Sequence, residues 1–196
     1  MGFRLNNLLS IISFISILAG ASLLAKPLCA EELLKKMTQE NVTAFIQEAT
    51  EITAGKREDM TPEQIAEFLD RHLEKKAHFK SLIKYNIPGY PPQDTTMSLD
   101  KKEYIEGIAK GKETLEGYES EILIKSVKIL KNGTEAMVQT NGYEAGIMPM
   151  PVEGGTTKNV PMEGNSICSQ ILVLNDGIIQ MYGANCETVV NFMPDN

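Results

Sequence analysis

The sequence has few of the side chains that bind metals or form catalytic groups. It contains two histidines, His72 and His78, and three cysteines among its 196 residues. A zinc site needs several nitrogen, sulfur or carboxylate ligands close together, and the spacing of the two histidines points them to different faces of a helix. No serine or cysteine stands beside a local base, which nucleophilic catalysis requires. The sequence therefore predicts no metal, no cofactor and no catalytic residue.

Positive charge is also scarce. The chain has 19 Lys and Arg residues against 26 Asp and Glu residues, for a net charge of −7. Nucleic acids and anionic membrane surfaces attract basic proteins, so this balance argues against both as partners. No internal repeat and no second domain is visible, and the chain is long enough to bury a core of its own.

Residues 1–30 have the features of a signal peptide. Arg4 and the free amine supply a short positive region, an apolar run without charge extends over 8–25, and Ala30 or Ala25 offers a small residue for cleavage. We expect an exported protein, periplasmic or secreted, whose single domain covers 31–196. The alternative is a retained membrane anchor, because the run approaches the roughly 20 residues that span a bilayer. A lipoprotein site at Cys29 is disfavoured, because the bulky Leu28 precedes it.

Cleavage would leave one cysteine pair, Cys168 and Cys186, in an oxidising compartment. The two residues lie on β-rich runs on either side of 175–177, which indicates a hairpin. Side chains alternate between the faces of a strand, so loop length decides whether the cysteines meet. A three-residue loop sets them diagonally on one face, a five-residue loop sets them opposite each other, and a two-residue turn requires a bulge. We predict a structural disulfide; the alternative is two free thiols.

Periodicity and turn residues divide the rest of the chain. The Gly-, Pro- and Met-rich stretch near the C-terminus is interpreted as a long or widely splayed loop, with Met148, Met150 and Met162 as candidates for an adaptable binding lip or as part of a mobile loop. The expected elements, in order, are a helix over 31–54, a helix over 61–73 capped by Thr61, a strand over 78–87, a loop over 88–97, a helix from Ser98 to Leu115, a hairpin over 122–140 turning at 131–134, the loop over 146–161, and the hairpin over 163–191.

Three stretches, at 87–92, 102–105 and 118–122, resemble the nuclear-transport-factor-2-like superfamily, and the likeness covers roughly 31–192. The resemblance implies an α+β fold in which N-terminal helices pack on a strongly bent antiparallel sheet and close a cone-shaped (cystatin-like) pocket. Members include isomerase-like and cyclase-like enzymes, transport factors, and non-catalytic binding or assembly domains. The isomerases use carboxylates with a tyrosine, whereas the first strand here offers Tyr85 and no carboxylate between His78 and Pro92.

Tyrosines are the candidate pocket residues, since a phenol can give a ligand a hydrogen bond in apolar surroundings; the alternative is ordinary core or interface tyrosines. The pocket candidates are Tyr85, Tyr104, Tyr143 and Tyr182, and Tyr118 belongs to the wider set of tyrosines that could line a pocket. We expect a non-catalytic ligand-binding or protein-interaction module for a small apolar ligand, with a homodimer through the open sheet face. The alternatives are a small-molecule isomerase, dehydratase or cyclase, and a membrane-tethered periplasmic assembly component. A buried carboxylate within reach of a pocket tyrosine would favour the enzyme.

Overall fold

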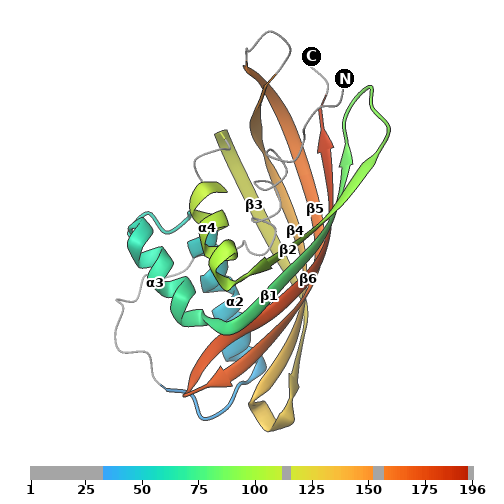
Figure 1. Ribbon diagram of the computed structural model, residues 1–196. Helices are drawn as coiled ribbons and strands as arrows, with labels where there is room; N and C mark the ends of the chain where they lie inside the picture. The colour runs from blue at the N-terminus through green and yellow to red at the C-terminus, as the bar shows by residue number, and fades with distance from the viewer. Residues whose placement is uncertain (1–32, 112–115, 152–156, 194–196) are drawn as a thin grey trace.

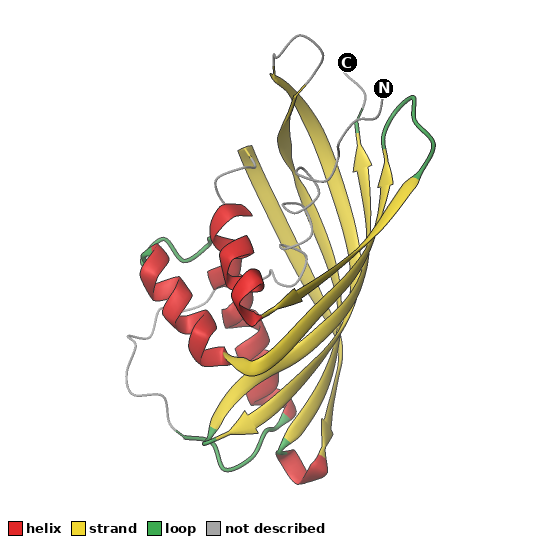
Figure 2. Ribbon diagram, viewed as in Figure 1, coloured by secondary structure: helices red, strands yellow, loops and turns green. Residues whose placement is uncertain are grey.

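The computed structural model of the chain describes residues 33–111, 116–151 and 157–193. In these residues three α-helices lie on one side of a six-stranded sheet, as Figures 1 and 2 show. The predicted signal peptide lies outside the described residues. The α+β class is confirmed. The elements, in chain order, are α2 (Gln39–Thr53), α3 (Pro62–His72), β1 (Leu73–Asn86), β2 (Gln93–Asp100), α4 (Lys101–Gly111), β3 (Glu116–Leu130), the short 3₁₀ helix η2 (Lys131–Gly133), β4 (Glu135–Pro151), β5 (Thr157–Asn175) and β6 (Ile178–Phe192).

The strands are arranged in the order β2-β1-β6-β5-β4-β3. All neighbours are antiparallel except β1 and β6, which run parallel. The sheet is therefore mixed, which corrects the expectation of a purely antiparallel one. Parallel strands need a long crossover between them, and here everything from β2 to β5 forms the connection that brings the last strand beside the first.

Capping residues set where the first two helices begin. Thr61 and Gln64 form a reciprocal capping box, so α3 begins where the sequence predicts. A second capping box, between Thr38 and Asn41, starts α2 later than expected. The predicted helix over 31–54 is therefore too long at its N-terminal end.

The residues before α2 join two hairpin turns instead of extending the helix. Leu34 N donates to Gly177 O at 2.9 Å, and Met37 N donates to Gly133 O at 2.7 Å. The two acceptors lie at the β5–β6 turn and the β3–β4 turn, which meet at the same end of the sheet. This segment therefore holds both turns against the start of α2.

The strand β2 and the start of α4 differ from prediction. The expected loop over 88–97 contains most of β2, an edge strand whose alternating half-buried residues face β1's inner side. Asp100, and not Ser98, caps α4. Asp100 Oδ1 accepts from Glu103 N at 2.9 Å, and Glu103 Oε2 accepts from Asp100 N at 3.0 Å. The hydroxyl of Ser98 instead lies 2.8 Å from His78 Nε2.

The predicted loop over 146–161 is largely a strand pair. Strand β4 continues to Pro151, and its partner β5 begins at Thr157. The described pairing of β4 with β3 ends at Ile147. Among the described residues the later prolines, Pro149 and Pro151, therefore pair only with β5, and a missing N–H on the other side breaks no described ladder bond. Met148 and Met162 are core residues, 1% and 2% exposed, which corrects their interpretation as a binding lip or mobile loop.

The last hairpin combines a two-residue turn with a bulge. Asn175 pairs with Ile178 across Asp176 and Gly177, both of which have positive φ, as in the tight turns of twisted hairpins. A register shift after Ile171 adds one residue to β6. The shift sets Cys168 directly opposite Cys186, with Cα atoms 4.2 Å apart and a disulfide between them. Of the three loop lengths considered in the sequence, the structure has the two-residue turn, and the bulge that this turn requires is present.

A pair of glycine substitutions tests the seating of the N-terminal segment on the last turn. Gly89 and Gly177 have similar φ values, 81° and 79°. A Cβ on Gly89 meets nothing within 4 Å, whereas one on Gly177 lies 2.8 Å from Leu33 Cβ. Gly89→Ala should lower the free energy of unfolding by about 1–2 kcal/mol, and Gly177→Ala by at least about 1 kcal/mol more, as measured by urea denaturation. Equal losses would contradict the seating of Leu33 on this turn.

Removal of the disulfide tests the contribution of the covalent link. The double variant Cys168→Ala/Cys186→Ala should lose about 3 kcal/mol of stability, because the open hairpin gains entropy in the unfolded chain. Added reductant should destabilise the wild type in urea denaturation and leave the double variant unchanged. Two free thiols in the wild type by non-reducing mass analysis would contradict the link.

Candidate functional site

The inner face of the sheet, which the helices cover, is organised in rows that cross the strands. Each row takes one inward residue from each of several paired strands, so the register alone defines its members. The amide row is Phe79, Ala184, Gln170 and Val138; the disulfide row is Ser81, Cys186, Cys168 and Thr140; the hydroxyl row is Ile83, Thr188, Ser166 and Gly142; and the carboxyl row is Tyr85, Val190, Gly164, Glu144 and Ser120.

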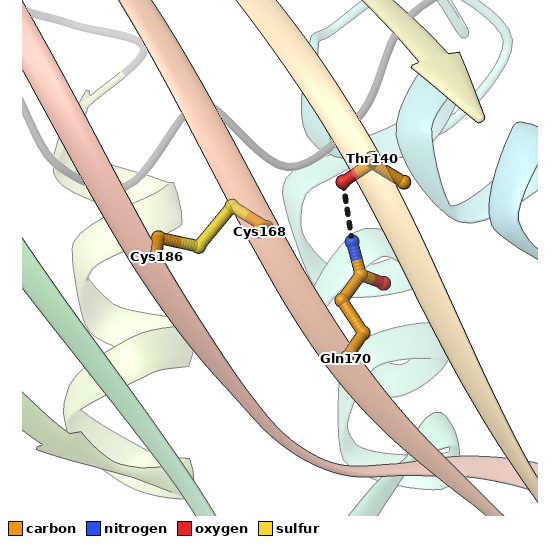
Figure 3. The surroundings of a disulfide bond; sticks show 4 residues. All are labelled: Thr140, Cys168, Gln170 and Cys186. Carbon is orange, nitrogen blue, oxygen red and sulfur yellow. Dashed lines mark hydrogen bonds between the residues drawn. A yellow bond between two sulfur atoms is a disulfide. The ribbon is translucent and has the colours of Figure 1, made fainter. Parts of the chain in front are cut away.

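Polar side chains form a belt across this buried face. The polar belt consists of Ser81, Thr140, Ser166, Gln170 and Thr188, each at most 7% exposed. Gln170 Nε2 donates to Thr140 Oγ1 at 3.2 Å, beside the disulfide (Figure 3). Three oxygens of the belt, Ser81 Oγ, Gln170 Oε1 and Thr188 Oγ1, have no hydrogen-bond partner among the described residues. A buried oxygen left in this way costs about 1–3 kcal/mol, so the belt is not explained by packing alone.

A carboxyl group is buried at the end of the carboxyl row. Glu144 is 1% exposed. Its cross-strand partner is Gly164, and a Cβ built there would lie 3.9 Å from Glu144 Oε2. The missing side chain leaves the carboxyl room to lie over the sheet. The site therefore presents an acidic group on the face that the resemblance to the superfamily assigns to the pocket.

Tyr118 brings a phenol to this carboxyl. The phenol oxygen is buried and makes no hydrogen bond of standard geometry to any of the described residues. Burial raises the pKa of Tyr118, and the negative charge of Glu144 raises it further, while Ser120 lowers it. The phenol thus stays protonated across the physiological range and is placed to donate. Tyr118 and Glu144 form the carboxylate–tyrosine arrangement that the sequence analysis associates with an enzyme.

The four predicted pocket tyrosines divide between the two faces of the sheet. Tyr85 lies on the inner face, in the carboxyl row, at 2% exposure. Tyr104 of α4 is also interior, stacked on Phe79 with ring centroids 4.1 Å apart, and burial raises its pKa. Tyr143 and Tyr182 lie on the outer face, the second at 46% exposure. On the outer face, burial and then the charge of Glu163 raise the pKa of Tyr143. The structure therefore does not bring the four together.

The outer face of the sheet has a shallow groove of about 640 Å³. Its lining includes Lys80, Lys125, Asn141, Asn185 and Glu187. Large apolar side chains are exposed on the same face, and no described helix covers it, as Figure 2 shows. The homodimer through this face stays a prediction. The exposed apolar residues of the face are Leu123, Met137, Ile167, Ile171, Tyr182 and Val189.

Neither histidine belongs to the inner rows. The ring of His72 packs against Phe45 and Phe68, and its Nδ1 lies 2.9 Å from Ile179 O. His78 is exposed beside Ser98. The described residues contain no group of three or more His, Cys, Asp or Glu side chains placed to hold a metal ion. Within the same residues, no helix is long and apolar enough to cross a membrane.

No protein-family model matches the chain, and a search of curated proteins finds no relative. Similar solved structures include a domain of unknown function with a cystatin-like fold from Nostoc punctiforme, 15% identical, TM-score 0.47, covering 77% of this chain and 78% of that one. A type 2 hexachlorocyclohexane dehydrochlorinase is 11% identical, TM-score 0.48, over 81% and 93%. A putative dehydratase of the NTF2-like family from Streptomyces avermitilis is 10% identical, TM-score 0.42, over 76% and 97%. At TM-scores below 0.5 these likenesses assign no activity to the chain.

The raised pKa of Tyr118 predicts a loss of stability at high pH. In the unfolded chain a tyrosine has a pKa of about 10, so above that pH the unfolded state loses a proton that the folded state keeps. The free energy of unfolding should therefore fall as pH rises from about 10. Urea denaturation at a series of pH values should show a shallower fall for Tyr118→Phe, and an intermediate one for Glu144→Gln, which removes only the charge. The same slope for Tyr118→Phe and the wild type would contradict this environment.

Proposed function

We propose that the inner face of the sheet binds a small organic molecule and that the chain is an enzyme of the isomerase, dehydratase or cyclase type. The observation that supports this is Glu144, 1% exposed on the inner face, with the buried phenol of Tyr118 beside it. The sequence alone favours a non-catalytic module, because no acid–base pair is visible in it. The pair of Glu144 and Tyr118 supplies candidates for the missing base and hydrogen-bond donor, and so favours the enzyme over the non-catalytic module.

Reactions of these three types share a proton transfer from a carbon next to a carbonyl group. The carboxylate of Glu144 takes the proton, and the C–H electron pair becomes the double bond of an enolate. The negative charge moves to the carbonyl oxygen, where the Tyr118 phenol donates a hydrogen bond to it. Glu144 then returns the proton. In an isomerisation it goes to another carbon; in a dehydration the enolate electrons expel the hydroxyl group, which takes the proton and leaves as water; in a cyclisation the enolate carbon bonds to a second carbonyl carbon and the resulting alkoxide takes the proton. No metal or cofactor enters the step.

We place the ligand on the carboxyl row, beside this pair. Tyr85 and Glu144 stand in the same row and are separated by Val190 and Gly164, both small. Neighbouring strands are about 4.8 Å apart, so three spacings place the two residues about 14 Å apart along a flat sheet. Bending of the sheet brings inward side chains closer. A small molecule over Val190 and Gly164 would have the carboxyl at one end and the Tyr85 side chain at the other.

Deuterium exchange tests the proton transfer without knowledge of the natural substrate. In D₂O the wild type should speed the incorporation of deuterium next to the carbonyl of cyclohexanone or dihydroxyacetone, followed by proton NMR. Glu144→Gln should reduce the rate at least about 100-fold because the base is lost. Tyr118→Phe should reduce it less than Glu144→Gln, since the base remains. Tyr143→Phe, on the outer face near other carboxylates, is the matched control and should exchange like the wild type.

Equal exchange by Glu144→Gln and the wild type, with both compounds, would reject the enzyme. A non-catalytic binding module is the second candidate, and the polar belt favours it, because its unpartnered oxygens lie outside the carboxyl row and would hold a ligand without Glu144. Binding without exchange would select this candidate.

We also propose that the protein is exported. The buried disulfide between Cys168 and Cys186 supports an oxidising compartment, in agreement with the signal peptide expected over 1–30. The alternative of a membrane-tethered assembly component stays a prediction.

A further inference from the structure

The polar belt specifies what kind of ligand the inner face can hold. An interior that only had to pack would be more stable with Val or Ala in place of its hydroxyl residues, because unpartnered buried oxygens are destabilising. Thr188 is 2% exposed, Gln170 is fully buried and Ser81 is 7% exposed, and each has an oxygen without a hydrogen-bond partner among the described residues. These oxygens are directed to the same face as Glu144 and lie on three adjacent rows.

We propose that the ligand of the inner face is hydroxylated, a cyclic polyol or hydroxylated carbonyl compound, and that Ser81, Gln170 and Thr188 recognise its hydroxyl groups. This inference rests on the proposed function, because it names the ligand class of the same site. It replaces the expectation of a small apolar ligand. An apolar molecule would cover these oxygens and leave them without partners.

The donors and acceptors of the belt match hydroxyl groups. The amide nitrogen of Gln170 is occupied by Thr140, which leaves its oxygen to accept from the ligand. A ligand must therefore supply at least one O–H or N–H at that point. Ser81 and Thr188 can each donate or accept. A hydroxyl also does both, whereas a carboxylate or phosphate has only acceptors to offer the Gln170 oxygen and would face the negative charge of Glu144.

The spacing of the rows suits a ligand of one ring. Rows follow each other every two residues, about 7 Å along a strand. Thr188 stands one row from Glu144 on one side and one row from Ser81 on the other. A six-membered ring with hydroxyls at both ends reaches two adjacent rows, here the hydroxyl and disulfide rows. The Gln170 amide extends into the disulfide row, where it bonds Thr140. Bound at Thr188, the ring would direct one hydroxyl toward Ser81 on the neighbouring strand and its opposite end toward Glu144, whose side chain extends from β4 two strands away.

Two compounds with the same ring test the ligand class. Calorimetry should detect binding of myo-inositol, with a hydroxyl on each ring carbon, and weaker or no binding of cyclohexanol, with only one. Thr188→Val keeps the shape of the side chain and removes the oxygen, and should weaken inositol binding about 3- to 10-fold, the effect of one hydrogen bond. Thr188→Ser should restore most of the affinity. Thr96→Val, on an exposed position of β2, is the matched control and should change nothing.

Three results would overturn the proposal. They are tighter binding of cyclohexanol than of inositol, no binding of inositol, and inositol binding that Thr188→Val leaves unchanged. In the last two cases a gain in stability for Thr188→Val would indicate that the belt holds buried water only. None of these results affects the deuterium exchange that depends on Glu144. Exchange that persists while inositol fails therefore rejects only the ligand class, and inositol binding without exchange rejects only the enzyme.

Discussion

One extra residue in β6 decides what the inner face of this protein contains. The bulge lies between the pairs Leu172–Met181 and Ile171–Gly183, and Tyr182 is the residue without a partner. Side chains alternate along a strand, so without the bulge Cys186, Thr188 and Val190 would point to the outer face. The disulfide, one hydroxyl of the polar belt and the centre of the carboxyl row therefore all depend on this single irregularity. Bulges re-aim side chains in this way where a sheet builds a site.

A second constraint acts from the opposite end of the chain. The residues before α2 hydrogen-bond to the carbonyls of Gly133 and Gly177, one in each of two hairpin turns. These turns close the β3–β4 and β5–β6 pairs, which together supply most of the inner rows. Positive φ at both glycines lets the backbone present its carbonyls to the approaching segment. The first described residues thus help to position strands that the chain reaches only much later.

Local chemistry made part of the fold predictable. Thr61 and Gln64 identify a helix start without tertiary context, and two turn signals locate the two long hairpins. The start of α2, the edge strand β2 and the continuation of β4 were not predicted. The segment before α2 bonds to turns distant in sequence, whereas β2 and the end of β4 pair with neighbouring strands across stretches whose prolines and glycines resemble loops. Pro149 resembles a loop residue until its pairing with Asn159 places it in a strand. Met148 resembles a lip residue until the strand pairing places it in the core.

The candidate site was predictable only in part, for a related reason. Tyr85 was found because it lies in an apolar, alternating strand. Glu144 was missed because a carboxylate in a strand normally indicates the solvent side, although the alternation from Val138 through Thr140 and Gly142 leads to it on the inner side. Tyr143 and Tyr182 show the opposite error, since residue type alone says nothing about which face a strand presents. Counting every second residue along the whole strand, polar residues included, would have assigned each side chain to its face of the sheet.

The parallel pairing of β1 with β6 has a consequence for how the protein folds during its synthesis. The pairing joins the first strand to the last inside the sheet. The two-stranded group β2–β1 and the three-stranded group β5–β4–β3 are therefore not hydrogen-bonded to each other until β6 forms between them. Contacts between such distant segments form slowly, because a long loop must close before they are made. A growing chain would therefore hold two separate parts of the sheet, and the hydroxyl and carboxyl rows would form only when β6 pairs with both of them.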